Sequence, residues 1–357
     1  MNYFPVGKLD LKLLERLIAL NPIKDPRVIV GPRIGEDAAV IDFGEKYLVA
    51  KTDPVTFTTY RIGWYAVNVN ANDIAAMGAT PKWFLATLLL PEKRTNKKLV
   101  TQIFNDIIKS TQALNITLCG GHTEISGKID RPIVVGHMLG EVDKDKLVVN
   151  TNARPGDDIL LTKGIAIEGT AIIAREKTSA LRKEFGEKFV KRAQAFINNP
   201  GLSVVKDALL ANKAARINAM HDPTEGGLAT GIFELTKASE TGAIIEMKKI
   251  QIYKETRQIC KLFNIDPLGL IASGALLIAL NPKDTRKVIT ALTKNGITCT
   301  KIGKLTKGSE GLRLLRKDEF IKMPMFKVDE ITSLITKKIT RAGNKPVKIH
   351  RRYTASG

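Results

Sequence analysis

The sequence contains few cysteines and no long apolar run. Its three cysteines, Cys119, Cys260 and Cys299, are widely spaced and odd in number, which fits a reducing compartment and gives neither a disulfide framework nor a zinc-ligand pattern. No stretch of about 18 apolar residues occurs, so no membrane-spanning helix is expected. The N-terminal residues carry charges within their apolar pattern and lack the apolar core of a signal peptide. We therefore expect a cytoplasmic protein.

Acidic residues are also scarce relative to basic ones. The chain has 36 aspartates and glutamates against 56 lysines and arginines, which gives a formal net charge of +20. Such a charge attracts nucleic acids and other polyanions. Aromatic residues make up only 6% of the chain, although single-strand binders usually interleave them with their cations. We therefore explain the positive charge by a generally lysine-rich composition, and nucleic-acid binding is the less favoured explanation. We expect residues 317–357 to form a basic C-terminal extension.

A chain of 357 residues with 28 glycines is typical of a globular protein with two domains. Predicted strands and helices alternate up to about residue 140, and a turn at residues 154–158 precedes a second alternating series. This alternation indicates α/β or α+β domains. We expect the first domain at residues 1–150 and the second at residues 151–316.

One helix, expected over residues 61–77, contains residues that are unusual in a helix interior. Its C-terminal part, NVNANDIAAMG, has three asparagines and one aspartate. Short polar side chains compete with the helix for backbone hydrogen bonds, and burying them without partners is costly. Asn72 and Asp73 therefore need polar partners, either within the protein or in a ligand. For Asn68 and Asn70 we expect structural hydrogen bonds.

Carboxylates gather at the ends of loops and elements in the first half of the chain. Each lies beside a glycine, a proline or a small residue; they are Glu36, Asp37, Asp53, Asp73 and Glu124. Mg²⁺ is a hard cation that takes oxygen ligands from one or two carboxylates and from nucleotide phosphates. Each residue alone has an ordinary alternative, such as a turn cap or a solvated position. Together they favour a Mg²⁺-nucleotide site.

Two glycine-containing segments are candidates for phosphate binding. Residues 120–124, GGHTE, follow a predicted strand, and glycines there allow the backbone to approach an anion. Residues 221–227, HDPTEGG, lead into a helix whose N-terminus Thr224 could cap and whose N–H groups could receive phosphate. Neither segment is a Walker A loop or a Rossmann glycine motif. An ordinary turn or a helix cap is the alternative for each.

Six segments occur in a recognisable order along the chain. They are GEDAAV (35–40), TDP (52–54), NDIAAMGATP (72–81), GGHTE (120–124), RPGD (154–157) and DPTEGGL (222–228). Together they resemble the aminoimidazole ribonucleotide (AIR) synthetase superfamily over residues 5–316. Within it, the chain looks most like the HypE branch of hydrogenase maturation factors. Thiamine-monophosphate kinase and selenophosphate synthetase share the fold but match these motifs less well.

The resemblance implies a PurM-like two-domain fold. In this fold the N-terminal sheet forms a barrel across a homodimer, and a C-terminal α/β domain packs on it. ATP and Mg²⁺ would bind in a groove shared by both domains and the partner subunit. The family chemistry is activation of an amide-type oxygen by phosphoryl transfer from ATP, and a maturation protein is an implied partner.

The resemblance also assigns roles to residues of this sequence. Asp37, Asp53 and Asp73 would hold the metal, and Asp73, His122 and Glu124 would act in catalysis. The full set of residues expected to contact the nucleotide is Asp37, Thr52, Asp53, Asn72, Asp73, Gly120, Gly121, Thr123, Asp222, Thr224 and Gly226.

The sequence departs from the HypE pattern at several positions. HypE uses a cysteine at the end of its C-terminal tail to receive a carbamoyl group, whereas this sequence ends in TASG and its last cysteine is Cys299. His122 stands where the superfamily often has a carboxylate, Glu225 stands where HypE usually has arginine, and Ser273 lies near the position of a HypE glutamate.

Three interpretations follow from this sequence. The first is an ATP- and Mg²⁺-dependent enzyme that acts on an amide- or carbamoyl-type acceptor. The second is a nucleotide-binding maturation or regulatory partner without catalysis. The third is a phosphotransferase like thiamine-monophosphate kinase.

Overall fold

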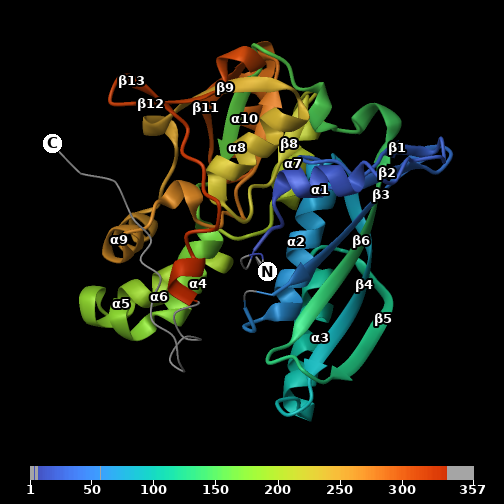
Figure 1. Ribbon diagram of the computed structural model, residues 1–357, viewed down its shortest axis with the longest axis vertical. Coiled ribbons are helices and arrows are strands. Elements are labelled where there is room, and N and C mark those ends of the chain that lie inside the picture. Colours follow the sequence, from blue (N-terminus) through green and yellow to red (C-terminus); the bar gives the residue numbers. More distant parts are fainter. Residues whose placement is uncertain (1–3, 5–6, 57, 336–357) are drawn as a thin grey trace.

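The computed structural model describes residues 4, 7–56 and 58–335, and it contains two sheets with helices packed against them (Figure 1). The first sheet has the strand order β1-β2-β3-β6-β4-β5, and the second has the order β13-β12-β9-β11-β7-β10-β8. Most neighbours are antiparallel, and β4–β5 and β9–β12 are the parallel pairs of these sheets. This is the mixed α/β architecture with two domains that the sequence predicts.

The first half of the chain supplies the first sheet and three helices. Its strands are β1 (Val28–Val30), β2 (Ala39–Asp42), β3 (Lys46–Val55), β4 (Thr80–Pro91), β5 (Thr117–Ser126) and β6 (Ile133–Asp143). Its helices are α1 (Leu11–Ile18), α2 (Ile62–Ala76) and α3 (Lys97–Ala113). Residues of α2, α3 and the sheet form one apolar core, so α2 and α3 cover the same face of the sheet.

Among the described residues, the second half of the chain supplies the second sheet and eight further α-helices. Its strands are β7 (Asp158–Thr162), β8 (Ala219–His221), β9 (Thr241–Glu246), β10 (Leu277–Leu280), β11 (Cys299–Lys307), β12 (Leu312–Arg316) and β13 (Glu319–Lys322). Its helices are α4 (Ile167–Glu176), α5 (Thr178–Phe185), α6 (Glu187–Gln194), α7 (Val205–Ala214), α8 (Gly227–Ala238), α9 (Lys254–Phe263), α10 (Thr285–Lys294) and α11 (Thr332–Ile335). Among the described residues no helix is both long and apolar enough to cross a membrane.

The second domain continues beyond Arg316, the boundary expected from the sequence. Strand β13 pairs with β12 in the second sheet, and Ile331 is fully buried in an apolar cluster with residues of α4 and α9. The segment up to residue 335 therefore belongs with this domain, because it contributes both strand pairing and apolar burial. The rest of the expected basic extension, residues 336–357, lies outside the described residues.

Glycines of β6 leave room for side chains of helix α2 to pack directly on the first sheet. A Cβ atom at Gly136 would lie 2.4 Å from Asn70 Nδ2, and one at Gly140 would lie 2.4 Å from Ile74 Cγ2. The Asn70 amide donates to the carbonyls of Ala66 and Asp53, and Asn68 donates to Trp64. The expected structural hydrogen bonds of these two asparagines are thus confirmed.

Asn72 joins the two domains. Its Nδ2 donates to the Leu202 carbonyl at 3.0 Å, and its Oδ1 accepts from the Val204 backbone N–H at 2.8 Å. Asn72 is fully buried, and both partners belong to the second domain. Its amide thus bonds two buried backbone groups in the loop before α7. The sequence analysis had instead expected Asn72 to contact the nucleotide.

Replacing Asn72 should therefore cost more stability than replacing Asn68, which sits one helical turn earlier and bonds only within its own helix. We expect Asn72→Ala to lower the free energy of unfolding by about 2 kcal/mol more than Asn68→Ala, because it leaves a buried carbonyl and a buried N–H without partners. Urea unfolding of both variants measures the difference. Equal losses would show that the bonds between Asn72 and residues 202–204 do not stabilise the domain contact.

Candidate functional site

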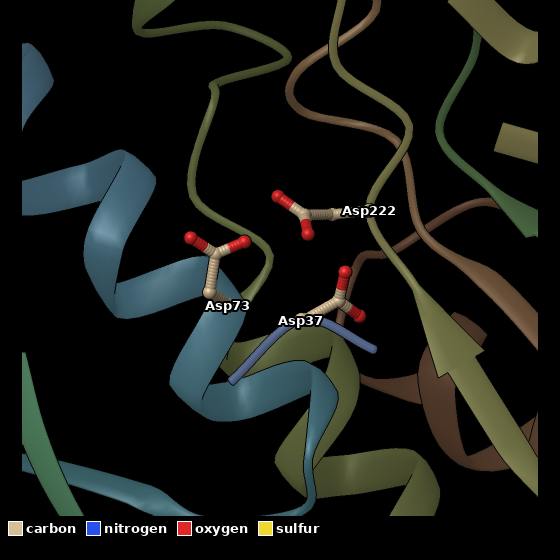
Figure 2. Close-up of side chains that lie close together, drawn as sticks. All are labelled: Asp37, Asp73 and Asp222. Atoms are coloured by element: carbon tan, nitrogen blue, oxygen red, sulfur yellow. The ribbon is translucent and has the colours of Figure 1, made fainter. Parts of the chain in front are cut away.

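Three buried carboxylates from both domains meet in one place (Figure 2). Asp37 lies in the loop before β2, Asp73 lies on α2, and Asp222 follows β8 directly. One oxygen of each carboxylate lies within 4.8 Å of the others, and all three side chains are buried. We call Asp37, Asp73 and Asp222 the carboxylate cluster.

Burial and mutual repulsion make this cluster electrostatically unfavourable without a cation. Burial raises the pKa of Asp73 to about 7, and burial together with the charges of Asp73 and Asp37 raises the pKa of Asp222 well above its usual range. Asp37 Oδ2 and both carboxylate oxygens of Asp222 have no hydrogen-bond partner among the described residues. Buried acceptors without donors are costly. Since Mg²⁺ prefers oxygen ligands of this kind, the cluster fits a divalent cation.

A buried histidine orients Asp37. His221 Nδ1 lies 2.7 Å from Asp37 Oδ1, and His221 Nε2 lies 3.0 Å from Glu234 Oε2 on α8. The Lys8 ammonium in turn binds the other oxygen of Glu234 at 3.0 Å. Burial alone would lower the pKa of His221, but Asp37 and Glu234 outweigh it and raise this pKa well above its usual range. The charged imidazolium therefore donates from both nitrogens and leaves Asp37 Oδ2 free for a cation.

Lys51 contributes the other positive charge beside the cluster. Its Nζ lies 3.2 Å from Asp73 Oδ2 and 4.0 Å from Asp53 Oδ2. Lys51 and Asp53 are two residues apart on β3, so their side chains share the sheet face that α2 covers. Burial would lower the pKa of Lys51, but the neighbouring carboxylates, Asp73 first and Asp53 next, raise it. Neither Lys51 nor His221 was among the predicted site residues, although the strand alternation places Lys51 beside Asp53.

The structure separates Asp53 and Thr52 from the cluster. The sequence predicted a metal set of Asp37, Asp53 and Asp73, whereas the close carboxylate group consists of Asp37, Asp73 and Asp222. Asp53 is linked to it through Lys51, and its side chain is 40% exposed. Thr52 is exposed on the opposite face of the sheet, because neighbouring residues of a strand alternate between faces.

The predicted glycine loop at residues 120–124 is instead part of the edge strand β5. A Cβ atom at Gly121 would lie 1.9 Å from the Ala86 carbonyl oxygen, so this glycine permits close pairing with β4. Gly120, Thr123 and the expected catalytic residues His122 and Glu124 are all exposed on this strand. Strand β5 is three strand spacings from β3, about 14 Å. Within one chain these residues are therefore not gathered at the carboxylate cluster.

Helix α8 follows the HDPTEGG segment as predicted, but Thr224 does not cap it. The N-cap is Gly226, and positive φ angles of 83° at Gly226 and 67° at Gly227 insert a turn between Thr224 and the helix. The Gly226 N–H donates to Asp329 Oδ2 at 2.7 Å. Burial raises the pKa of Asp329 to about 6. The Asp329 carboxylate thus accepts from the Gly226 N–H, a backbone donor that the sequence analysis assigned to phosphate. No local sequence pattern could have predicted this contact, because the two residues are 103 positions apart.

Known proteins resemble this chain over most of its length. A putative hydrogenase expression/formation protein from Methanocaldococcus jannaschii is 29% identical over 315 residues, which cover 86% of this chain and 90% of that protein. A selenide, water dikinase from Nitratidesulfovibrio vulgaris is 30% identical over 274 residues, which cover 74% of this chain and 70% of that protein.

A solved structure shares the fold. The hydrogenase maturation protein HypE in complex with ATP superposes with a TM-score of 0.70 at 21% sequence identity, covering 84% of this chain and 92% of that one. This confirms the PurM-like two-domain fold. Residues 35–142 match the model of the AIR synthase related protein N-terminal domain, and residues 154–314 match that of the C-terminal domain. The chain belongs to the AIR synthase related protein family.

Proposed function

We propose that this protein is an ATP- and Mg²⁺-dependent enzyme that activates an amide- or carbamoyl-type oxygen of its acceptor by phosphoryl transfer. The observation that carries the proposal is the carboxylate cluster, several of whose oxygens are buried and lack donors. Such a cluster is expensive unless a cation binds it, and both domains contribute to it. The fold therefore maintains a costly arrangement that a cation would relieve.

In the proposed reaction the cluster residues hold the cation and the surrounding residues hold the cluster. Asp37, Asp73 and Asp222 would hold Mg²⁺, which would supply neutralisation of phosphate charge. His221 fixes the rotamer of Asp37 through a 2.7 Å contact, and the Glu234 carboxylate keeps His221 charged. Asp73 is fixed by its position on α2, which Asn72 ties to the second domain. Catalysis of this kind depends on positioning and charge more than on covalent chemistry.

The relatives support this class of reaction. The structural neighbour was solved with ATP, and the relative from Nitratidesulfovibrio vulgaris is named as a dikinase. A carbamoyl dehydratase from Rhizobium leguminosarum, 26% identical over 267 residues, supports a carbamoyl-type acceptor. A nucleotide-binding partner without catalysis is the alternative that the assay below separates.

We also propose a homodimer formed along β5. This strand pairs only with β4 among the described residues, so its outer edge carries unpaired backbone groups, and it is exposed over nearly its whole length. Pairing of two such edges would bring His122 and Glu124 of one subunit toward its partner. This would give these residues access to a nucleotide groove from which they are separated within one chain.

Removing the charge of Asp73 should abolish catalysis. We expect Asp73→Asn to lower Mg²⁺-dependent ATP hydrolysis by roughly 100-fold or more, because a neutral amide binds a divalent cation more weakly than a carboxylate does. The matched control is Asp130→Asn, whose carboxylate is 69% exposed and lies outside the cluster. Release of ADP from purified protein is the measurement. ATP binding without turnover, in the wild type and with amide or carbamoyl acceptors added, would favour the non-catalytic alternative.

A charge on β5 should disrupt the dimer. Ile125 is 52% exposed near the end of this strand, and Ile125→Lys should convert a dimer of about twice 39.2 kDa into monomers, because it would place an unpaired ammonium at the new interface. The control is Phe43→Lys, which also replaces an exposed apolar side chain but lies in the β2–β3 turn. Light scattering gives the mass. A monomeric wild type, or a dimer unaffected by Ile125→Lys, would contradict pairing through β5.

A further inference from the structure

We propose that Lys51 contacts the terminal phosphate of the nucleotide and serves as the second cation of the site, beside one divalent ion held by the carboxylate cluster. This inference rests on the proposed function and goes beyond it, because it assigns a catalytic residue and limits the number of metal ions. It is carried by where the ammonium lies, by the charges around it and by its access to solvent.

The Lys51 ammonium occupies the place where a cation bridging Asp53 and Asp73 would lie. Its Nζ is 3.2 Å from Asp73 Oδ2 and 4.0 Å from Asp53 Oδ2. A second metal ion between these carboxylates would have to displace it. Strand β3 fixes this position, since Val49, Lys51 and Asp53 point to one face and Val49 is fully buried in the core.

The other nearby positive groups are already engaged. The His221 imidazolium lies between Asp37 and Glu234, and Lys8 pairs with Glu234 at 3.0 Å. Asp73 and Asp53 have Lys51 as their ion-pair partner among the described residues. Lys51 is the lysine of this group that pairs directly with a residue of the carboxylate cluster, and its ammonium has three donors, so it can keep this contact and also meet a phosphate.

The Lys51 side chain is partly accessible to solvent, unlike its partner Asp73. Its side chain is 22% exposed, compared with 5% for Asp73 and 40% for Asp53. A phosphate approaching from solvent can therefore contact the Lys51 ammonium while Asp73 stays buried. Lysine is a common phosphate ligand and acts as a point charge toward it.

The chemical step is balanced without a proton from Lys51. The bond between the terminal phosphorus and the oxygen bridging to ADP breaks, and a bond forms from that phosphorus to the acceptor oxygen. The ammonium keeps its proton and neutralises charge on the transferred group. The competing explanation is that Lys51 only forms a structural ion pair. In that case, replacing Lys51 would change the affinities for ATP and ADP equally.

The experiment compares nucleotide and metal affinities of three variants by titration calorimetry. Lys51→Met removes the charge at similar length, and Lys51→Arg keeps it. Lys46→Met is the matched control, because Lys46 lies on the same strand but pairs with Glu141 and Asp143 at the surface. ATP and ADP are titrated in the presence of Mg²⁺, and Mg²⁺ alone is titrated into nucleotide-free protein.

We expect Lys51→Met to weaken ATP binding at least tenfold and ADP binding less than threefold, since ADP lacks the contacted phosphate. The same variant should bind Mg²⁺ more tightly without nucleotide, because a competing positive charge is gone. Lys51→Arg should keep ATP affinity within threefold of the wild type, and Lys46→Met should change neither affinity.

If the wild type binds ATP, either of two results would overturn this inference and leave the proposed function standing. One is unchanged ATP affinity in Lys51→Met, and the other is an equal loss of ATP and ADP affinity in that variant. A wild type that binds no ATP would instead overturn the proposed function. Circular dichroism checks that each variant is folded. If Lys51→Met does not fold, Lys51→Gln is measured by the same ratio of ATP to ADP affinity and decides the question.

Discussion

Repulsion among three buried carboxylates is the constraint around which this structure is organised. Asp37, Asp73 and Asp222 have oxygens within 4.8 Å of one another, and burial keeps water from screening them. The fold opposes this repulsion with a charged histidine on one side and a lysine on the other. Their two charges do not saturate the cluster, because several of its oxygens still lack donors. The arrangement is therefore suited to binding a cation.

Helix α2 couples this electrostatic arrangement to the contact between the domains. Asn72 and Asp73 are consecutive residues, and the first binds the second domain while the second enters the cluster. Because Asp222 comes from that second domain, the distance between Asp73 and Asp222 depends on how the domains are docked. The glycines of β6 that let α2 lie close to the sheet set the height of Asp73 above it. The geometry of the carboxylate cluster therefore depends on how the two domains pack.

Much of the fold could be predicted from the sequence, and the site could be predicted in part. The structure brings together Asp37 and Asp73, to which the resemblance assigned the metal, and that role stays a prediction. The two-domain fold followed from the resemblance that the motifs carry. Asp222 was expected near nucleotide and not within the close carboxylate group, since spacing along the chain does not reveal which carboxylates converge.

The residues that sequence reasoning missed act over long distances or through backbone geometry. Asp329 binds Gly226 from a segment more than 100 residues away, and Glu234 reaches Asp37 only through His221. Asn72 looked like a ligand because it is polar and buried, but its partners are backbone groups of the other domain. Gly121 looked like part of an anion loop, whereas close strand pairing explains it. Polarity predicted that these residues need partners without predicting which ones.

The central claim is that the carboxylate cluster holds the cation of the nucleotide site. The most direct measurement is anomalous diffraction from crystals grown with Mn²⁺ and a non-hydrolysable ATP analogue, since Mn²⁺ accepts the same oxygen ligands as Mg²⁺. The account predicts an anomalous peak within bonding distance of oxygens from Asp37, Asp73 and Asp222. A metal bound by phosphates alone, or held by Asp53 with Lys51 displaced, would contradict it.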